Sequence, residues 1–119
     1  MKTVLILLAG FFSTLHIHGA TIDWANLSGG NWSEPTNWSP NQVPGAGGTA
    51  NITAAGTYTV TVDVDATVAQ FNIGGASGLQ TVNVTSITLN AATSGIVSAN
   101  GVLNMNGTSE LEGMVTVES

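Results

Sequence analysis

The sequence has 119 residues, a formal net charge of −6 at pH 7, no Cys, and a single Lys or Arg, which is Lys2. Nucleic acid and anionic lipid are thereby excluded as partners, because proteins bind both through Lys and Arg. Both His also precede residue 20, so the rest of the chain has no side chain for Ser-His-Asp or Cys-His catalysis, for a Schiff base, or for an imidazole or thiolate zinc site.

The first twenty residues have the order of a secretory signal peptide. Lys2 precedes an apolar run over 4–15, and the small residues Gly19 and Ala20 follow it. We therefore predict a signal-peptide helix over 1–20, with cleavage after Gly19 or Ala20 both open, and a secreted or cell-surface protein. The apolar run is shorter than the roughly 20 residues of a membrane-spanning helix, so we expect no membrane span in the mature chain.

Residues 21–48 are rich in Trp, Pro and Gly and show no lasting period, which predicts an N-terminal cap or loop region. Its three tryptophans are the candidate ligand-binding residues: Trp24, Trp32 and Trp38. Two interpretations stand beside each other. Exposed indole faces would form a platform that stacks on sugar rings, whereas buried ones would form an apolar plug over the first turn of the fold. The plug is the favoured interpretation.

From Thr49 onwards the chain has the period of two that is typical of strands. Residues 57–65 place Tyr58, Val60, Val62 and Val64 on one face, with Thr and Asp on the other. Similar pieces follow, separated by Gly, Ser or Ala: 68–73, 82–84, 87–89, 103–105 and 115–117. We predict an all-β fold whose residues 49–119 form the turns of a parallel β-helix or solenoid, with a β-sandwich as the alternative.

Two further features bear on the solenoid. Asn and Thr side chains could stack in ladders between turns, and the pieces 87–90 and 103–106 share an apolar-x-apolar-Asn pattern at a spacing of sixteen residues, which is short for one turn. The sequence also stops at 117–119, inside or just after a strand, without a polar, Pro-containing or helical cap. Because an uncapped turn exposes backbone groups and apolar surface, we expect a truncated piece of a longer protein.

The remaining chemistry rests on carboxylates. Asp63 and Asp65 could bind calcium, which prefers oxygen ligands, although no calcium-loop motif surrounds them; the alternative is that they form the wet face of a strand. We expect no other cofactor. Glu110 and Glu112 share a strand face, as glycosidase carboxylates could, but an acidic strand edge explains them more simply.

A family resemblance is carried by seven pieces of the sequence, at 29–33, 37–39, 43–47, 50–52, 56–63, 66–68 and 71–75. The first three and the last read Gly-Gly-Asn-Trp-Ser, Asn-Trp-Ser, Val-Pro-Gly-Ala-Gly and Phe-Asn-Ile-Gly-Gly. The stretch 24–75 resembles the N-terminal part of bacterial exported β-helix proteins of the autotransporter-passenger type. Gly48 stands where such proteins commonly have an acidic residue. The resemblance implies a β-helix and an exported location, and it carries over no catalytic residue, because members include adhesins, surface-layer-like proteins and polysaccharide-degrading enzymes.

Together these features predict a secreted or cell-surface β-helix segment with a structural or adhesive role and no enzymatic activity of its own. Its Thr- and Asn-rich face would meet an extracellular polysaccharide or a surface protein. Two alternatives stay open. One is a part of a polysaccharide-active enzyme whose catalytic residues lie beyond residue 119, and the other is a small carbohydrate-binding module that uses the three tryptophans.

Overall fold

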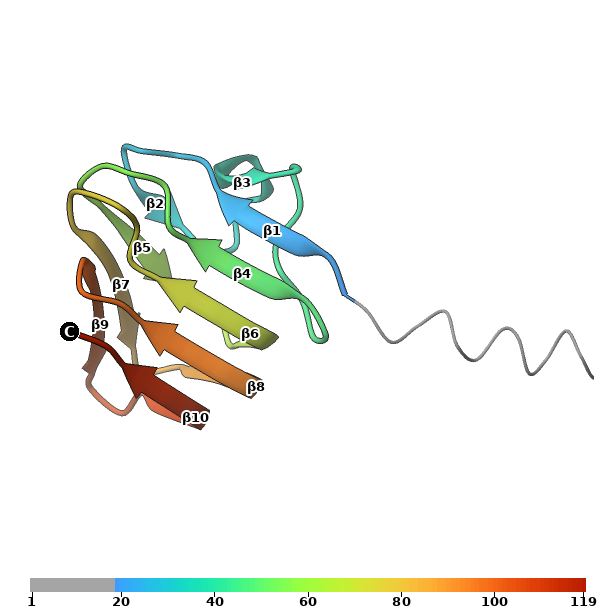
Figure 1. Cartoon of the computed structure of the whole chain (residues 1–119). Helices are drawn as coiled ribbons and strands as arrows, with labels where there is room; N and C mark the ends of the chain where they lie inside the picture. The colour runs from blue at the N-terminus through green and yellow to red at the C-terminus, as the bar shows by residue number, and fades with distance from the viewer. Residues whose placement is uncertain (1–18) are drawn as a thin grey trace, which may run out of the picture.

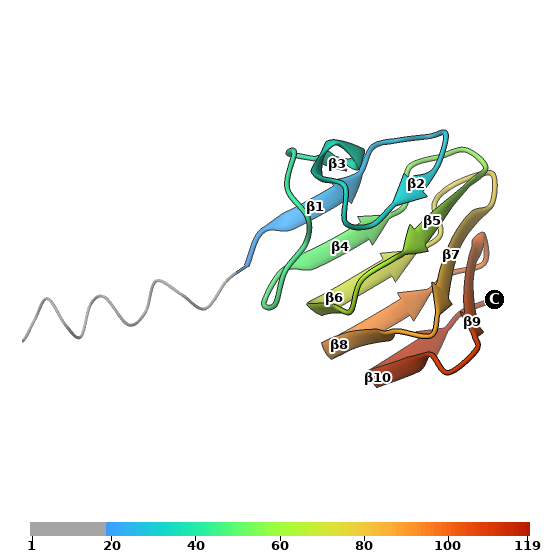
Figure 2. The same ribbon diagram turned by 180° about the vertical axis from the view of Figure 1, so that it is seen from behind.

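The computed structural model describes residues 19–119, so the predicted signal-peptide helix lies outside the described residues apart from Gly19 and Ala20. The described chain coils into a β-solenoid of about three turns, built from two sheets that face each other across one core. Figure 1 shows the molecule with one sheet in front, and Figure 2, the view from the opposite side, shows the other sheet in front.

Six strands form the larger sheet: β1 (Thr21–Trp24), β3 (Trp38–Ser39), β4 (Thr49–Ile52), β6 (Ala66–Ile73), β8 (Thr88–Val97) and β10 (Glu110–Val117). Four strands form the smaller sheet: β2 (Gly30–Asn31), β5 (Tyr58–Val62), β7 (Gln80–Thr85) and β9 (Gly101–Asn106). A short 3-10 helix, η2 (Pro35–Asn37), precedes β3.

The strand order shows how the chain winds. The larger sheet has the order β10-β8-β6-β4-β1-β3 and the smaller sheet the order β2-β5-β7-β9, so consecutive strands from β4 onwards alternate between the sheets. Every pairing is parallel except that of β1 with β3. The predicted parallel solenoid is confirmed, and the β-sandwich alternative, which needs antiparallel sheets, is wrong.

The strand register gives the length of one turn. Tyr58 pairs with Gln80 and Gln80 pairs with Gly101, so successive turns are 22 and then 21 residues long. The sixteen-residue spacing between 87–90 and 103–106 is therefore not the repeat. The two pieces lie in β8 and β9, which belong to different sheets. Each turn contains two strands and two corners, so this spacing measures only part of a turn.

The predicted alternation in 57–65 is confirmed within β5 but not beyond it. Tyr58, Val60 and Val62 are buried, whereas the threonines between them are exposed. The strand ends at Val62, and Val64, which was expected to face the core, is 43% exposed. The physical reason is that 63–65 form the corner where the chain crosses from the smaller sheet to the larger one.

The region 21–48 contains more regular structure than a cap or loop. Strands begin at Thr21 rather than near Thr49, because Ile22 and Trp24 face the core and β1 pairs in parallel with β4. After β2 and η2 the chain folds back as β3, which runs antiparallel to β1 and forms the edge of the larger sheet.

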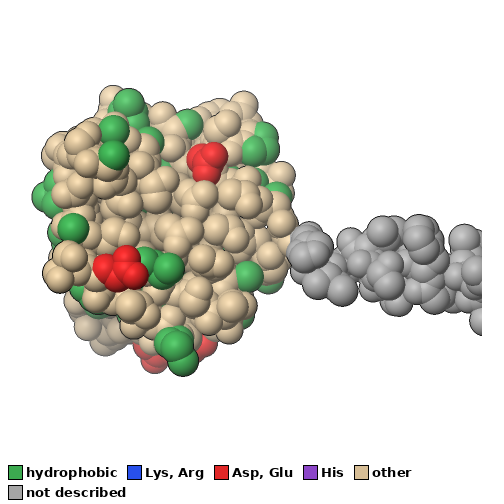
Figure 3. Space-filling model, viewed as in Figure 1, with side chains coloured by type: hydrophobic (Ala, Val, Ile, Leu, Met, Phe, Trp, Pro, Cys, Tyr) green, Lys and Arg blue, Asp and Glu red, His purple; other side chains and the backbone are tan. Residues whose placement is uncertain are grey.

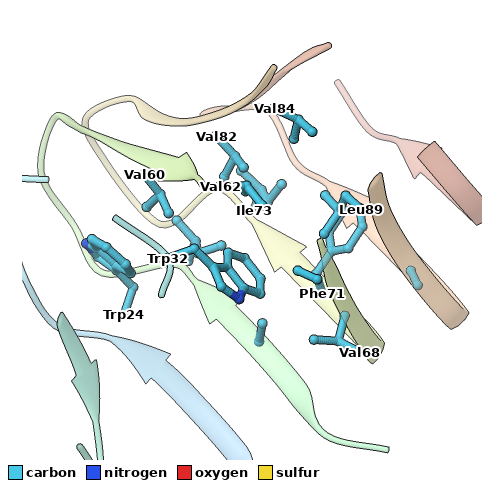
Figure 4. Close-up of a cluster of buried hydrophobic side chains, with 14 of the residues drawn as sticks. Trp24, Trp32, Val60, Val62, Val68, Phe71, Ile73, Val82, Val84 and Leu89 are labelled. Carbon is cyan, nitrogen blue, oxygen red and sulfur yellow. The ribbon is translucent and has the colours of Figure 1, made fainter. Parts of the chain in front are cut away.

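The core lies between the two sheets and is aliphatic along most of its length. Strands β5 and β7 contribute valines from one side, and β6 and β8 contribute Val68, Phe71, Ile73 and Leu89 from the other (Figure 4). These side chains are 2% exposed or less. Burial of aliphatic side chains from both sheets holds the turns together without disulfides.

Candidate functional site

The three tryptophans lie together at the β1–β3 end of the core. Trp24, Trp32 and Trp38 are 2%, 1% and 1% exposed. The ring of Trp38 meets both other rings edge to face, with centroids 4.9 Å apart in each pair. Trp38 Nε1 donates to the backbone oxygen of Trp32 at 2.8 Å, and Trp24 Nε1 donates to that of Asn26 at 2.6 Å. All three indoles are therefore packed, and those of Trp24 and Trp38 are also hydrogen-bonded.

This burial removes the exposed indole faces that the sugar-stacking hypothesis requires. The segment around the rings is itself fixed by Asn37, which is 7% exposed, accepts from Asn26 Nδ2 at 2.8 Å and donates to the Asn31 oxygen at 3.0 Å. Because the neighbouring amides hold each other, the loops over the tryptophans are part of the packing. The arrangement is that of an apolar plug.

Asp63 and Asp65 lie in the β5–β6 corner and contact different turns of the solenoid. Asp63 accepts from Ser33 N at 3.0 Å and from Ser33 Oγ at 2.5 Å, on the turn before it. Asp65 accepts from Thr88 N at 2.9 Å, on the turn after it. Within residues 19–119 no group of three or more His, Cys, Asp or Glu lies close enough to hold a metal ion. The two aspartates act as links between turns.

The Ser33 contacts also act on the charge of Asp63. Desolvation at the corner raises the pKa of this carboxyl, but the hydrogen bonds from the Ser33 hydroxyl, the Ser33 N–H and the backbone of Asp63 itself outweigh it. The net result is a pKa below the ordinary value of 3.8. The carboxylate form is the one that the folded structure stabilises.

Glu110 and Glu112 lie on β10 with exposed side chains, and Glu112 Oε2 accepts from Asn90 Nδ2 at 2.6 Å. A glycosidase needs its carboxylates in a walled pocket. A small pocket occurs near the start of β1, and its lining residues include Gly19, Ile22 and Gln42 but nothing ionisable. The structure does not bring this pocket and the glutamate pair together.

The outward side of the larger sheet is crossed by side-chain ladders that run from turn to turn. Asn72 Nδ2 donates to Asn51 Oδ1 at 2.8 Å, and Asn51 Nδ2 donates to Asp23 Oδ1 at 2.9 Å. The predicted Asn ladders are thus present. Figure 3 shows this side as mostly uncharged, with separate acidic patches. Its amides are largely occupied with each other and with carboxylates.

The outward side of the smaller sheet is different. We define the Thr/Asn face as the outward side chains of β5, β7 and β9 at Thr59, Thr61, Thr81, Asn83 and Asn104. Thr59 pairs with Thr81, whose neighbour on β9 is Val102, and Thr61, Asn83 and Asn104 form one row across three strands. Strands in a sheet are about 4.8 Å apart, and alternate residues along a strand are about 6.6 Å apart, so these groups form a regular grid.

The Thr/Asn face is neutral and its hydroxyls are available. None of its five residues is ionisable, and the one side-chain hydrogen bond within it joins Asn104 Nδ2 to Asn83 Oδ1 at 2.8 Å. Among the described residues, the hydroxyls of Thr59, Thr61 and Thr81 have no side-chain or backbone partner. Sequence reasoning predicted a Thr- and Asn-rich face, and the outward side of the smaller sheet is one such face.

No family model, curated protein or solved structure matches this chain. In the part of the chain that the structure describes, no helix has the length and apolar character needed to cross a membrane.

Proposed function

We propose that this chain is a segment of a secreted or cell-surface β-solenoid with a structural or adhesive role, and that its Thr/Asn face binds an extracellular polysaccharide. The observation that carries the proposal is the neutral grid on the smaller sheet, in which threonine hydroxyls without a protein partner lie beside the Asn83 and Asn104 amides. The sequence order of residues 1–20 and the resemblance over 24–75 support an exported location.

The chemistry of the Thr/Asn face suits a neutral polymer of hydroxyl groups. Each threonine hydroxyl donates one hydrogen bond and accepts others, and each amide does both, so the face complements sugar hydroxyls without any charge. Single contacts of this kind are weak. A repeated grid that meets a repeated polymer gains strength by multivalency, which is how an adhesive surface works.

The core behind the Thr/Asn face makes the grid rigid. Val60, Val82 and Val84 alternate with its members on β5 and β7 and are fully buried. A side chain that alternates with packed valines keeps its position, so less freedom is lost on binding. We propose no catalytic role. Four carboxylates accept hydrogen bonds from neighbouring turns and so link the turns of the fold: Asp23, Asp63, Asp65 and Glu112.

Substitution of the hydroxyls tests this function. The variant Thr59→Val, Thr61→Val, Thr81→Val keeps the side-chain shape and strand preference while it removes every hydroxyl of the face. The control variant Thr21→Val, Thr49→Val, Thr67→Val makes the same change on the larger sheet. Both are compared with the unchanged protein, expressed from its full coding sequence, in co-sedimentation with insoluble cellulose, chitin and mannan.

We expect the unchanged protein and the control to sediment with at least one polysaccharide, and the face variant to stay in solution. The binding should change little with salt, because no ionic contact contributes. Absence of binding by the unchanged protein, or full binding by the face variant, would overturn the proposal. Release of soluble sugars during the assay would instead favour a polysaccharide-active enzyme.

A further inference from the structure

One row of polar side chains continues beyond the Thr/Asn face. Thr61, Asn83 and Asn104 lie at the same level on β5, β7 and β9, and Asn31 on β2 pairs with Thr61. Figure 2 shows the four strands of this sheet, whose order is β2-β5-β7-β9. We call these four residues the cross-strand row. It runs perpendicular to the strands, from turn to turn of the solenoid.

The cross-strand row has a polar side chain on each of the four described strands, whereas the neighbouring rows are interrupted. In the next row Thr59 and Thr81 are followed by Val102 on β9. Beyond that row Thr57 lies beside Leu79, since Thr57 Oγ1 accepts from Leu79 N at 3.3 Å, and the Leu79 side chain is 44% exposed. A polymer that crosses the turns along the cross-strand row therefore meets a hydrogen-bonding group on each strand.

Asn31 is suited to binding although it lies outside the Thr/Asn face. Its side chain is exposed, and the next residue, Trp32, is buried in the plug. Its backbone oxygen accepts from Asn37 Nδ2 at 3.0 Å, and Trp32 N donates to Thr61 O at 2.8 Å. Within residues 19–119 the side-chain amide of Asn31 has no hydrogen-bond partner. The backbone is thus fixed while the amide stays available.

The spacing of the cross-strand row fits one class of glycan. Neighbouring strands are about 4.8 Å apart, so each turn places one row member at that interval. This interval is close to the length of one sugar unit in an extended, β-1,4-linked glycan. Outward groups along a single strand are about 6.6 Å apart, which does not match that length. An α-1,4-linked glucan coils, so its units cannot follow a straight row.

We propose that the bound polysaccharide is an extended, β-1,4-linked glycan that lies along the cross-strand row with one sugar unit on each turn. This inference rests on the proposed polysaccharide binding, and it adds the linkage class, the direction of the polymer and Asn31 as a binding residue. Each sugar unit exchanges hydrogen bonds with one row member. Because the contact repeats on every turn, the weak single contacts add up.

Two alanine variants test the direction of the polymer. Asn31 lies one step beyond the Thr/Asn face across the strands, and Thr57 lies one step beyond it along the direction of β5. Both side chains are exposed. Asn31→Ala and Thr57→Ala are compared with the unchanged protein, each expressed from its full coding sequence, in co-sedimentation with cellulose, chitin and β-1,4-linked mannan over a range of polymer concentrations. Thermal melting followed by circular dichroism checks that both variants fold.

We expect Asn31→Ala to weaken binding about fivefold, the effect of losing one neutral hydrogen bond, and Thr57→Ala to weaken it less than twofold. An effect of Thr57→Ala that equals or exceeds that of Asn31→Ala would overturn the proposed direction.

Starch granules test the linkage class, because starch and cellulose are both neutral polymers of glucose and differ in linkage. We expect the unchanged protein to sediment with at least one of the three β-1,4-linked polymers and not with starch. Sedimentation with starch as strong as with the others, or with starch alone, would overturn the linkage class but leave polysaccharide binding in place. Absence of binding to all four polymers would overturn the proposed function, and this inference with it.

Discussion

Gly95 on β8 lies directly opposite Phe71 on β6, and the phenyl ring occupies the space that a side chain at Gly95 would need. A Cβ atom at Gly95 would come within 2.4 Å of Phe71 Cζ. Phe71 is fully buried, so its ring has no free volume into which it could turn. At this position in the core, the large side chain of Phe71 therefore fills the space left by the missing side chain of Gly95.

Gly95→Ala should therefore destabilise the fold by overpacking. We expect a loss of about 1–3 kcal/mol in the free energy of unfolding, measured by urea denaturation followed by far-UV circular dichroism. Phe71→Leu should destabilise on its own, but in the double variant the smaller side chain should recover part of the loss caused by Gly95→Ala. Strict additivity of the two changes would show that the residues do not share this space.

The tryptophan plug predicts a graded response at Trp38. Trp38→Ala should cost about 3–5 kcal/mol of unfolding free energy, because it empties the centre of the cluster. Trp38→Phe should cost less, because an aromatic ring still fills most of the space. Its remaining cost should come mainly from the Trp32 carbonyl, which loses its indole donor. Leu27→Ala is the control, since Leu27 is 54% exposed and should matter little. Equal effects of all three changes in urea denaturation would contradict the plug.

Gln80 is fully buried and predicts a strong effect of a polar-to-apolar change. Its side-chain oxygen accepts from Gly75 N at 2.6 Å, and its side-chain nitrogen donates to the oxygens of Ser77, at 2.9 Å, and Gly56. Gln80→Leu would leave these backbone groups without a hydrogen-bond partner, and it should lower the free energy of unfolding by at least about 2 kcal/mol. Gln42→Leu, at an exposed position, should change the melting temperature little. A Gln80→Leu protein that melts like the unchanged one would contradict the role of Gln80.

Much of the fold could be predicted from local alternation. The alternation of apolar and polar residues in 58–62 predicts both the strand and its buried face, because one side of the strand faces the core and the other faces water. The turn length could not be read in the same way, since corners of different length separate the strands and blur any fixed period. β1 was missed because a four-residue strand offers only Ile22 and Trp24 as evidence.

The candidate sites were harder to predict, because tertiary contacts decide them. The tryptophan spacing fits a platform as well as a plug, and only the return of β3 along β1 buries the rings. Asp63 and Asp65 share a strand face in the sequence pattern, but the corner directs them to different turns. Gln80 could have been found, since it has the same parity as the buried Val82 and Val84.

The link between Asp63 and Ser33 predicts a pH-dependent stability. The folded state lowers the pKa of Asp63 below 3.8, so it binds this proton less readily than the unfolded chain does. The link should stabilise the fold fully at pH values above the pKa of Asp63 in the unfolded chain. It should lose its effect as the pH falls through the lower pKa of Asp63 in the folded state. Asp63→Asn should be less stable than the unchanged protein at pH 7, and the difference should shrink in acid.

The comparison isolates one carboxyl, because all other acidic groups are common to both proteins. Free energies of unfolding are measured in urea at several pH values between about 3 and 7, a range that spans the ordinary aspartate titration. Ser33→Ala removes the hydroxyl donor and is the matched control: in that background, Asp63→Asn should show a weaker pH dependence. A difference between Asp63→Asn and the unchanged protein that stays constant with pH would mean that Ser33 does not hold the carboxylate.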